Sequence, residues 1–300
     1  MTTVYKLLLR SLAINIADQL KQHSVVIVLD QAIYGKACAI VWKCRDLFNR
    51  VVLVMGGFHT SMVFLAIIGK RFADAGLQDL MVESGIVGPS SVAAVLAGKH
   101  YNRGVRAHQI IMEGLIRLLW KSFEQWLQTQ EGNFLNETCD LHAAVKMFRQ
   151  KNFTQEAYLE LIHSQQFAAL HEAFHQFCAS LQSPVARLWL SYTEMVQLLL
   201  LFIRSMRTAD WQLHLHCIRK MLPFMFAYDH VNYSRFLSKF WCDMTVLKDT
   251  NPEAHEQLQN GAFCVPSGAK CHSARLVLTK SSSKHSTVNQ KQEVESSAPV

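Results

Sequence analysis

The apolar and polar positions along the chain divide it into two parts with different periodicities. Two short apolar runs rich in valine, Val25–Leu29 and Val51–Met55, each stop at a polar cluster, and an amphipathic stretch separates them. Such runs predict buried strands, and the stretch at about residues 32–47 predicts a helix. Parallel strands need a crossover of this kind, so we expect the two runs to be parallel neighbours in one sheet.

The rest of the chain reads as helical. From about residue 105 to 247 apolar residues recur at three- and four-residue spacing, which predicts helices, whereas an apolar run at 274–278 predicts one more strand. We therefore expect an α/β, predominantly helical protein with a small N-terminal, partly parallel sheet and a large all-helical region. The expected parts are an α/β region at 1–104, a helical region at 105–247, the C-terminal remainder of the α/β region at 248–278, and a disordered tail at 279–300, which is rich in Ser, Lys and Gln.

Composition places the chain among globular proteins. Half of its 300 residues are apolar, and the formal charge of +7 permits a nucleic acid or an acidic partner without requiring either. Its eight cysteines form no Cys-x-x-Cys pair, so we read them as small buried residues in a reducing compartment. Residues 1–21 predict an amphipathic helix without a signal-peptide cleavage site. The apolar run at 196–203 is shorter than the roughly 18 residues that span a bilayer. We expect an intracellular protein that does not enter a membrane.

The two predicted strands end in residues that can carry chemistry. Asp30 follows the first strand, and Gly56-Gly57-Phe58-His59 follows the second. The carboxyl ends of parallel strands meet at one edge of a sheet, where metal ligands and catalytic acids are often found, so Asp30 and His59 are candidate catalytic residues. The alternative is that each side chain caps the helix that follows it.

A second candidate site is the segment His171-Glu172-Ala173-Phe174-His175. Histidines at i and i+4 share a helix face and could bind Zn²⁺, with Glu194 as a third ligand and Glu172 as the base of a metallopeptidase-like hydrolase. Against this, fourteen histidines make an accidental pair easy to find, and the residues before the segment predict helices rather than a sheet edge. We favour polar groups on a partly exposed helix face, and expect Zn²⁺ only under the alternative reading.

A third candidate is a basic cluster that contains Lys99, Tyr101, Arg103 and Arg106. Such a cluster suits a phosphate backbone, and the tyrosine could stack on a base. The alternative is a helix start with solvated charges.

A fourth candidate is the polar segment that contains Asp229, His230, Asn232 and Tyr233, whose spacing places several members on one helix face. It could act as a functional site or as a hydrogen-bond network that holds helices together. The chain has no Walker loop, dinucleotide glycine fingerprint or Gly-x-Ser-x-Gly elbow.

Several motifs together resemble a large family of unknown function that is found among mobile elements of fish and invertebrate genomes. They are Asp30-Gln31, the segment 56–59, Ile68-Gly69-Lys70, Glu83-Ser84-Gly85, the segment 98–108, Trp189-Leu190-Ser191-Tyr192, Trp211 and the segment 229–233. The resemblance covers about residues 10–265.

A remoter likeness is to ribonuclease H-like transposases. It implies that Asp30 is a metal-binding acid flanked by His59, that the helical block is an insertion, that Mg²⁺ is bound where the site is intact, and that DNA is the partner, with the nucleus as a location. This sequence departs from that pattern, because no earlier strand carries a first acid and the last acid is unidentified. We therefore expect a catalytically incomplete, transposase-like remnant with weak nucleic-acid binding. The alternatives are the zinc hydrolase and a helical interaction scaffold without chemistry, and the sequence specifies no protein partner.

Overall fold

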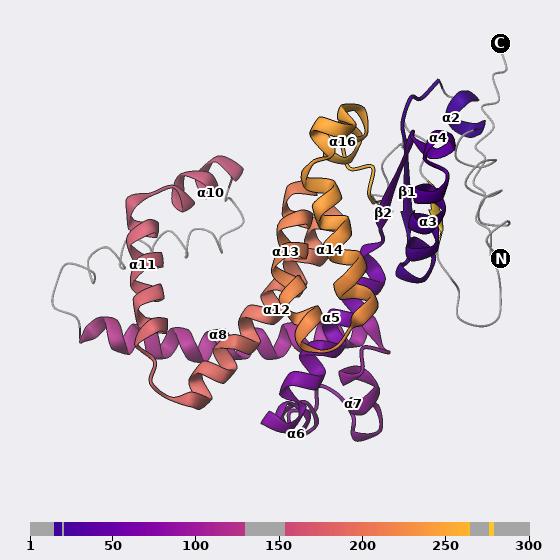
Figure 1. Ribbon diagram of the computed structural model, residues 1–300. Helices are drawn as coiled ribbons and strands as arrows, with labels where there is room; N and C mark the ends of the chain where they lie inside the picture. The colour runs from indigo at the N-terminus through magenta and orange to yellow at the C-terminus, as the bar shows by residue number, and fades with distance from the viewer. Residues whose placement is uncertain (1–14, 20, 130–153, 265–275, 279–300) are drawn as a thin grey trace, which may run out of the picture. The chain divides into compact units, whose positions relative to one another are not determined.

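The computed structural model describes residues 15–19, 21–129, 154–264 and 276–278 (Figure 1). The chain forms two compact units: residues 1–61 with 202–300, and residues 62–201. The helices between 202 and 247 thus share a unit with the sheet, and residues 62–104 lie in the other unit, whereas the sequence suggested divisions at 104 and 247. Most of the expected N-terminal helix and the expected tail at 279–300 lie outside the described residues.

The first unit is built on a parallel sheet. Strand β1 (Val25–Leu29) lies between β2 (Val51–Met55) and β3 (Leu276–Leu278), in the order β2-β1-β3. Val25 pairs with Val51 and Leu29 with Met55, while Ile27 pairs with Leu276. The predicted parallel pairing of the two N-terminal strands is confirmed, and the last apolar run contains a strand as expected.

Helices pack against this sheet. Helix α3 (Gln31–Lys43) connects β1 to the short α4 (Arg45–Phe48) and then to β2, and α2 (Asn15–Gln19) is tied to the start of β2 by an ion pair of 2.6 Å between Asp18 and Arg50. The C-terminal helices of this unit are α13 (Trp211–Ala227), α14 (Val231–Thr245), α15 (Leu247–Thr250) and α16 (Pro252–Gln259).

Close packing fixes α14 against α3. A Cβ atom at Gly35 would lie 2.7 Å from Cζ of Phe236, so the glycine leaves room for the Phe236 ring to pack on α3. Tyr34, which is 1% exposed, makes edge contacts with Phe236 and Phe240 at ring-centroid distances of 6.2 and 6.3 Å. The start of α14 is thereby held near the start of α3.

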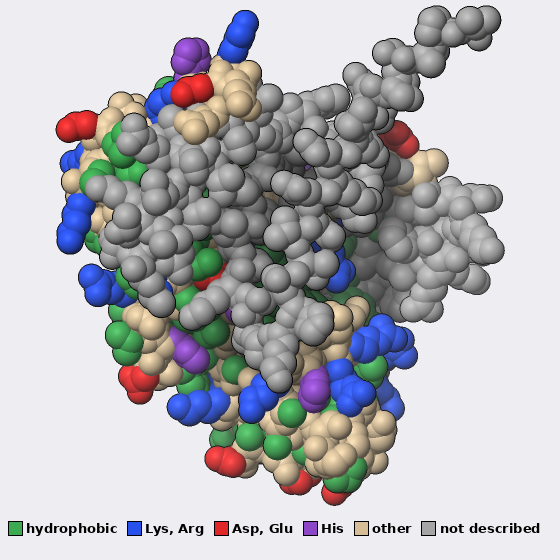
Figure 2. Space-filling model, turned by 90° about the vertical axis from the view of Figure 1, so that its right-hand side faces the viewer, with side chains coloured by type: hydrophobic (Ala, Val, Ile, Leu, Met, Phe, Trp, Pro, Cys, Tyr) green, Lys and Arg blue, Asp and Glu red, His purple; other side chains and the backbone are tan. Residues whose placement is uncertain are grey.

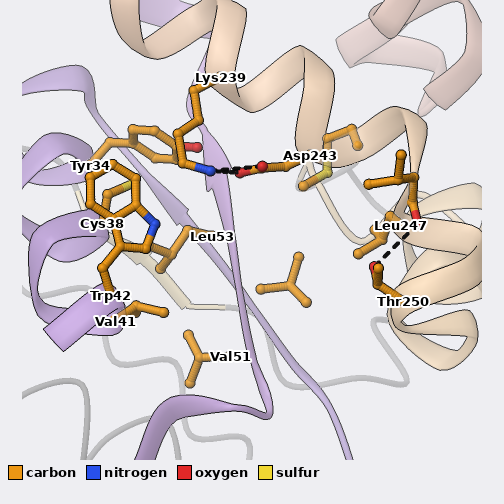
Figure 3. Close-up of a pocket in the computed structure, with 13 residues that line it drawn as sticks. Tyr34, Cys38, Val41, Trp42, Val51, Leu53, Lys239, Asp243, Leu247 and Thr250 are labelled. Carbon is orange, nitrogen blue, oxygen red and sulfur yellow. Dashed lines mark hydrogen bonds and ion pairs between the residues drawn. The ribbon is translucent and has the colours of Figure 1, made fainter. Parts of the chain in front are cut away.

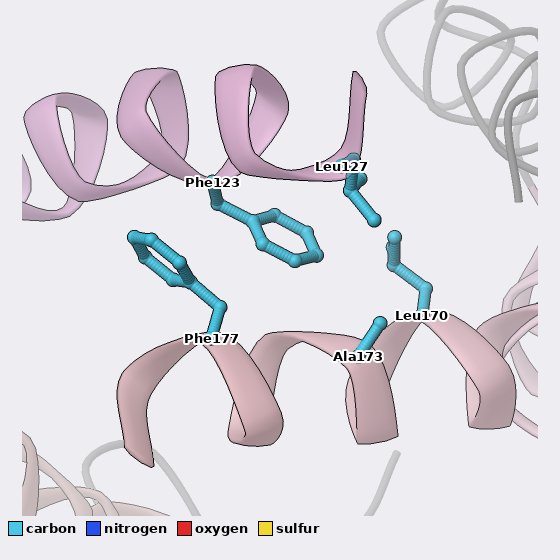
Figure 4. Close-up of a cluster of buried hydrophobic side chains, with 5 residues drawn as sticks. All are labelled: Phe123, Leu127, Leu170, Ala173 and Phe177. Atoms are coloured by element: carbon cyan, nitrogen blue, oxygen red, sulfur yellow. The ribbon is translucent and has the colours of Figure 1, made fainter. Parts of the chain in front are cut away.

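The second unit is helical throughout its described part. It contains most of α5 (Gly57–Phe72), then η2 (Ala73–Ala75), α6 (Leu77–Glu83), α7 (Pro89–Leu96), α8 (Tyr101–Gln128), α10 (Gln155–Ile162), α11 (Gln165–Ser180) and most of α12 (Pro184–Thr208). Figure 4 shows the apolar cluster that joins α8 to α11, in which Phe123 and Leu127 face Leu170, Ala173 and Phe177. The rings of Phe123 and Phe177 thus pack α8 against α11.

One helix of the described part, α12, is long and apolar enough to cross a membrane by length and composition alone. Of its most apolar 18-residue window, 39% is buried inside the protein, and Tyr192, Leu199 and Phe202 are fully buried. The core helix of a globular protein passes the same test.

Candidate nucleic-acid interface and the carboxyl edge of the sheet

Asp30 lies at the carboxyl end of the central strand of the sheet. The chain leaves β1 toward β2 on one side and returns to β3 on the other, so the end of β1 is the point where the strand order reverses. Ligands of open α/β sheets bind at such a point. Asp30 is 5% exposed, and its side chain accepts a hydrogen bond of 2.9 Å from the backbone N–H of Ile33. Asp30 is therefore the N-cap of α3, which was the alternative reading of this residue.

Tyr233 lies close enough to Asp30 for the two to interact electrostatically. Burial, and secondarily the charge of Asp30, raise the pKa of Tyr233 to about 12. The sequence placed these residues in two separate candidate groups, and the fold brings them together because α14 packs on α3. In the polar segment that contains Tyr233, the ring centroid of His230 lies 6.5 Å from that of Tyr233. Asp229 and Asn232 of the same segment are exposed.

His59 is half-buried in the first turn of α5, which starts directly after β2. The ladder between β1 and β2 continues into this turn, because the Gly56 N–H donates to the carbonyl of Leu29 at 2.6 Å. A Cβ atom at Gly57 would lie 2.2 Å from Sδ of Met206, so a larger residue here would displace the Met206 side chain that packs against it. The Gly-Gly pair therefore has a structural explanation that needs no ligand.

Carboxylates do not gather around Asp30 in the described part of the chain. Within residues 15–19, 21–129, 154–264 and 276–278, no three His, Cys, Asp or Glu side chains lie together as a metal ion would require. Two-metal phosphoryl chemistry needs several carboxylates around its Mg²⁺ ions. The described residues thus supply one acid of such a site, and that acid is engaged as a helix cap.

The histidines of the zinc hypothesis share an exposed face of α11. The rings of His171 and His175 are 4.4 Å apart between centroids, and Glu172 accepts a hydrogen bond from Gln176. Glu194, on α12, lies near the thiol of Cys178, whose pKa is raised by burial and then by this carboxylate. Since the described residues contain no three-ligand group, the zinc-hydrolase reading stays a hypothesis that the geometry does not favour.

The basic residues of the third candidate surround the start of α8. Lys99, Arg103 and Arg106 are exposed and Tyr101 is half-buried. Nη1 of Arg103 donates to Oγ of Ser91, at 3.2 Å, which links the first turns of α7 and α8. Figure 2 shows several Lys and Arg side chains and two histidines on the lower part of the face that it draws, with acidic side chains below them.

The electrostatic setting of this helix start is positive. The chain has no acidic residue between Glu83 and Glu113, and α8 is 28 residues long. The N–H groups of its first turn carry the positive end of the helix dipole. Backbone and side chains therefore both favour an anion at this place, and we call residues Lys99, Tyr101, Arg103 and Arg106 the α8 basic cluster.

Two histidines are fully buried, of which His108 belongs to the segment 98–108 named for the family resemblance, whereas His214 was not singled out from the sequence. His108 is 0% exposed, its Nδ1 lies 2.8 Å from the hydroxyl of Tyr192, and its Nε2 has no partner among the described residues. Nδ1 of His214 lies 3.1 Å from Oγ of Ser205. The imidazole ring of His214 also stacks with the rings of Phe202 and Trp211. Burial lowers the pKa of His108 to about 4 and that of His214 to about 3. Both positions fall on apolar helix stripes, which is the only sequence signal that could have indicated their burial.

Together these features define an α/β, predominantly helical protein with a small parallel sheet and an exposed basic helix start. The chain belongs to the family described as Domain of unknown function (DUF8702), which matches residues 1–277. No curated protein and no solved structure matches it. The expectation of a family of unknown function is confirmed, whereas an origin in mobile elements and a likeness to ribonuclease H stay predictions.

Proposed function

We propose that this protein is a transposase-like protein derived from a mobile element, and that it binds nucleic acid through the α8 basic cluster without cutting it. The observation that carries the proposal is the exposure of Lys99, Arg103 and Arg106 around the start of a long helix. Binding to phosphates requires that such side chains be free to reach the solvent, and most of the affinity for nucleic acid comes from these contacts.

The spacing of the cluster suits adjacent phosphates. Arg103 and Arg106 are three residues apart on α8, so they project from neighbouring positions on one side of the helix. Arginine binds phosphate oxygens through two parallel N–H donors, and Tyr101 offers an aromatic face for a base. Contacts of this kind read the backbone rather than the sequence, so the binding is expected to be weak and sequence-independent.

The absence of cutting rests on the carboxyl edge of the sheet. Asp30 is the residue that the ribonuclease H-like pattern would use for Mg²⁺; the residue is 5% exposed and its carboxylate caps α3. Among the described residues no further carboxylates complete a metal site with it. This supports a remnant that has kept a binding surface and lost phosphoryl chemistry.

The binding half of the proposal is tested by a salt titration. Fluorescence anisotropy of labelled single-stranded and duplex DNA gives the slope of log affinity against log salt between about 50 and 200 mM. Replacing Arg103 and Arg106 by alanine should weaken binding to every sequence and lower the duplex slope by about 1.8, because each lost phosphate contact contributes about 0.9.

A matched control uses the same helix. Arg117 and Lys121 are also exposed on α8, outside the α8 basic cluster, and Arg117 is paired with Glu113. The variant R117A/K121A therefore removes the same two positive charges from the protein as R103A/R106A, but at another place on the helix. The control should keep the wild-type slope. Equal losses in both variants would show that net charge alone drives binding, and no binding at low salt would end the proposal. Mg²⁺-dependent cleavage that D30A abolishes would refute the non-cutting half only.

A further inference from the structure

The pocket beside β2 presents charged groups that already satisfy one another. It has a volume of about 240 Å³ and opens between α3, β2 and the α14–α15 corner (Figure 3). Its charged lining residues are Lys239 and Asp243, and the ammonium donates to both carboxylate oxygens at 2.7 and 2.6 Å. The charge of this pocket is therefore balanced from within, in contrast to the imidazoles on α11.

His171 and His175 are neighbouring imidazoles on the solvent side of α11. They are one turn apart on one face of the helix, both are exposed, and their ring centroids lie 4.4 Å apart. Phe167, one turn before His171, stacks with the His171 ring at a centroid distance of 6.5 Å. One imidazole is thus restrained on the side away from its partner, and both rings face the solvent.

The separation of the two rings suits a shared metal ion. Zn²⁺ binds an imidazole nitrogen at about 2.0–2.1 Å, which places the ring centre about 3.2 Å from the metal. Two such rings have centroids about 4.5 Å apart when the two bonds meet at a right angle, and about 5.2 Å apart at the tetrahedral angle. The observed 4.4 Å is close to the first value. Rotation of two exposed side chains therefore brings a nitrogen of each ring to one ion without moving the helix.

The acidic residues near this pair are engaged elsewhere. Glu172 accepts a hydrogen bond of 3.2 Å from Gln176, and Glu194 of α12 lies near the thiol of Cys178. Within the described residues, no third His, Cys, Asp or Glu side chain completes a metal-binding group with the two imidazoles. An ion held here has two protein ligands, whereas catalytic zinc sites have three. The pair therefore suits metal binding without the machinery of a hydrolase.

We infer that His171 and His175 chelate a late first-row divalent metal ion such as Ni²⁺, Cu²⁺ or Zn²⁺. Imidazole suits these ions, whereas Mg²⁺ and Ca²⁺ prefer oxygen ligands. Once one imidazole has bound the ion, the second binds it intramolecularly, so the pair holds it more tightly than a single histidine does. The site is independent of the proposed function, because neither histidine belongs to the α8 basic cluster.

The test combines an affinity with a location, both measured on the full chain at pH 7.5. Calorimetric titration with NiCl₂ gives the dissociation constant, and hydrogen exchange followed by mass spectrometry locates the ion. An ion that joins two turns of α11 must leave before this part of the helix opens. At about ten times the dissociation constant, exchange of the amides between the two histidines should therefore slow about tenfold. The same concentration of MgCl₂ should leave the exchange unchanged.

The matched variant H175Q/Q176H keeps the composition and moves the second imidazole by one residue. Both positions are exposed, so the swap spares the core, but a helix turns by about 100° per residue and the two rings no longer share a face. The swap and H171Q should each weaken Ni²⁺ binding about tenfold, which at the same Ni²⁺ concentration reduces the slowing of exchange to about twofold.

A third variant, H163Q, controls for the loss of any exposed histidine. His163 is exposed just before α11 and has no histidine one turn away, so H163Q should bind Ni²⁺ like the wild type. Slowed exchange that survives in H175Q/Q176H, equal slowing by Mg²⁺, an equal loss of affinity in H163Q, or no slowing by Ni²⁺ in the wild type would overturn the inference.

Discussion

We predict that His108 makes the stability of the second unit depend on pH. The imidazole is fully buried in α8 beside the hydroxyl of Tyr192, and burial lowers its pKa from 6.5 to about 4. Between these two values the unfolded chain takes up a proton that the folded chain excludes. The stabilising effect of a neutral His108 is therefore complete above pH 6.5 and is lost as the pH falls toward 4.

The size of the effect follows from the two pKa values. A difference of about 2.5 pH units corresponds to about 3 kcal/mol when the group is fully titrated. Between pH 7.5 and 5 the expected loss is about 2 kcal/mol, because protonation of the folded form is then still negligible. That is a large share of the 5–15 kcal/mol by which domains are typically stable.

The variant H108Q isolates this contribution. Glutamine cannot titrate here and can keep a hydrogen bond to Tyr192, so H108Q should be less stable than the wild type at pH 7.5. The difference in the free energy of unfolding between the wild type and H108Q should be about 2 kcal/mol smaller at pH 5 than at pH 7.5. Urea unfolding followed by circular dichroism measures both free energies. His216 is exposed on α13, and H216Q should follow the wild type at every pH. Parallel curves for H108Q and the wild type would refute the assigned role of His108.

Two further predictions concern the fold and the carboxyl edge of the sheet. Gly69→Ala should lower the melting temperature strongly in a thermal scan, because its Cβ would lie 2.1 Å from the carbonyl of Leu96, whereas Gly114→Ala, with open space around it, should stabilise α8 by about 0.5–1 kcal/mol. If both substitutions changed the melting temperature by the same amount, the result would contradict the close approach of α5 to α7 at Gly69. Asp30→Asn should lower the pKa of Tyr233 below its present value of about 12, because a negative charge that disfavours the phenolate is removed. Ultraviolet titration of the phenol measures this shift, and an unchanged curve would mean that burial alone sets the pKa.

The strands could be predicted because their signal is local. Val25–Leu29 and Val51–Met55 are apolar runs of strand length separated by a helix-sized segment, and that spacing leaves parallel pairing as the natural result. Asp30 as an N-cap is equally local, since its bond to the N–H of Ile33 spans three residues. These features depend on neighbours in sequence, which the sequence displays directly.

The candidate sites depend on contacts that the sequence does not display. Tyr233 approaches Asp30 across about two hundred residues of chain because α14 packs on α3, where Gly35 leaves room for Phe236. The pocket beside β2 likewise combines residues of α3 with Lys239 and Asp243 of α14. The basic cluster could be found in the sequence because it is contiguous, although its exposure could not.

Site-specific photocross-linking tests the central claim most directly. A benzoylphenylalanine in place of Tyr101 should cross-link to DNA, because the α8 basic cluster holds the backbone beside that position. The same amino acid in place of Leu118, which is 65% exposed farther along α8, should not cross-link. Cross-links at 101 that disappear in the R103A/R106A background are the predicted result. Equal cross-linking at both positions, or at 118 alone, would contradict the placement of nucleic acid at the start of α8.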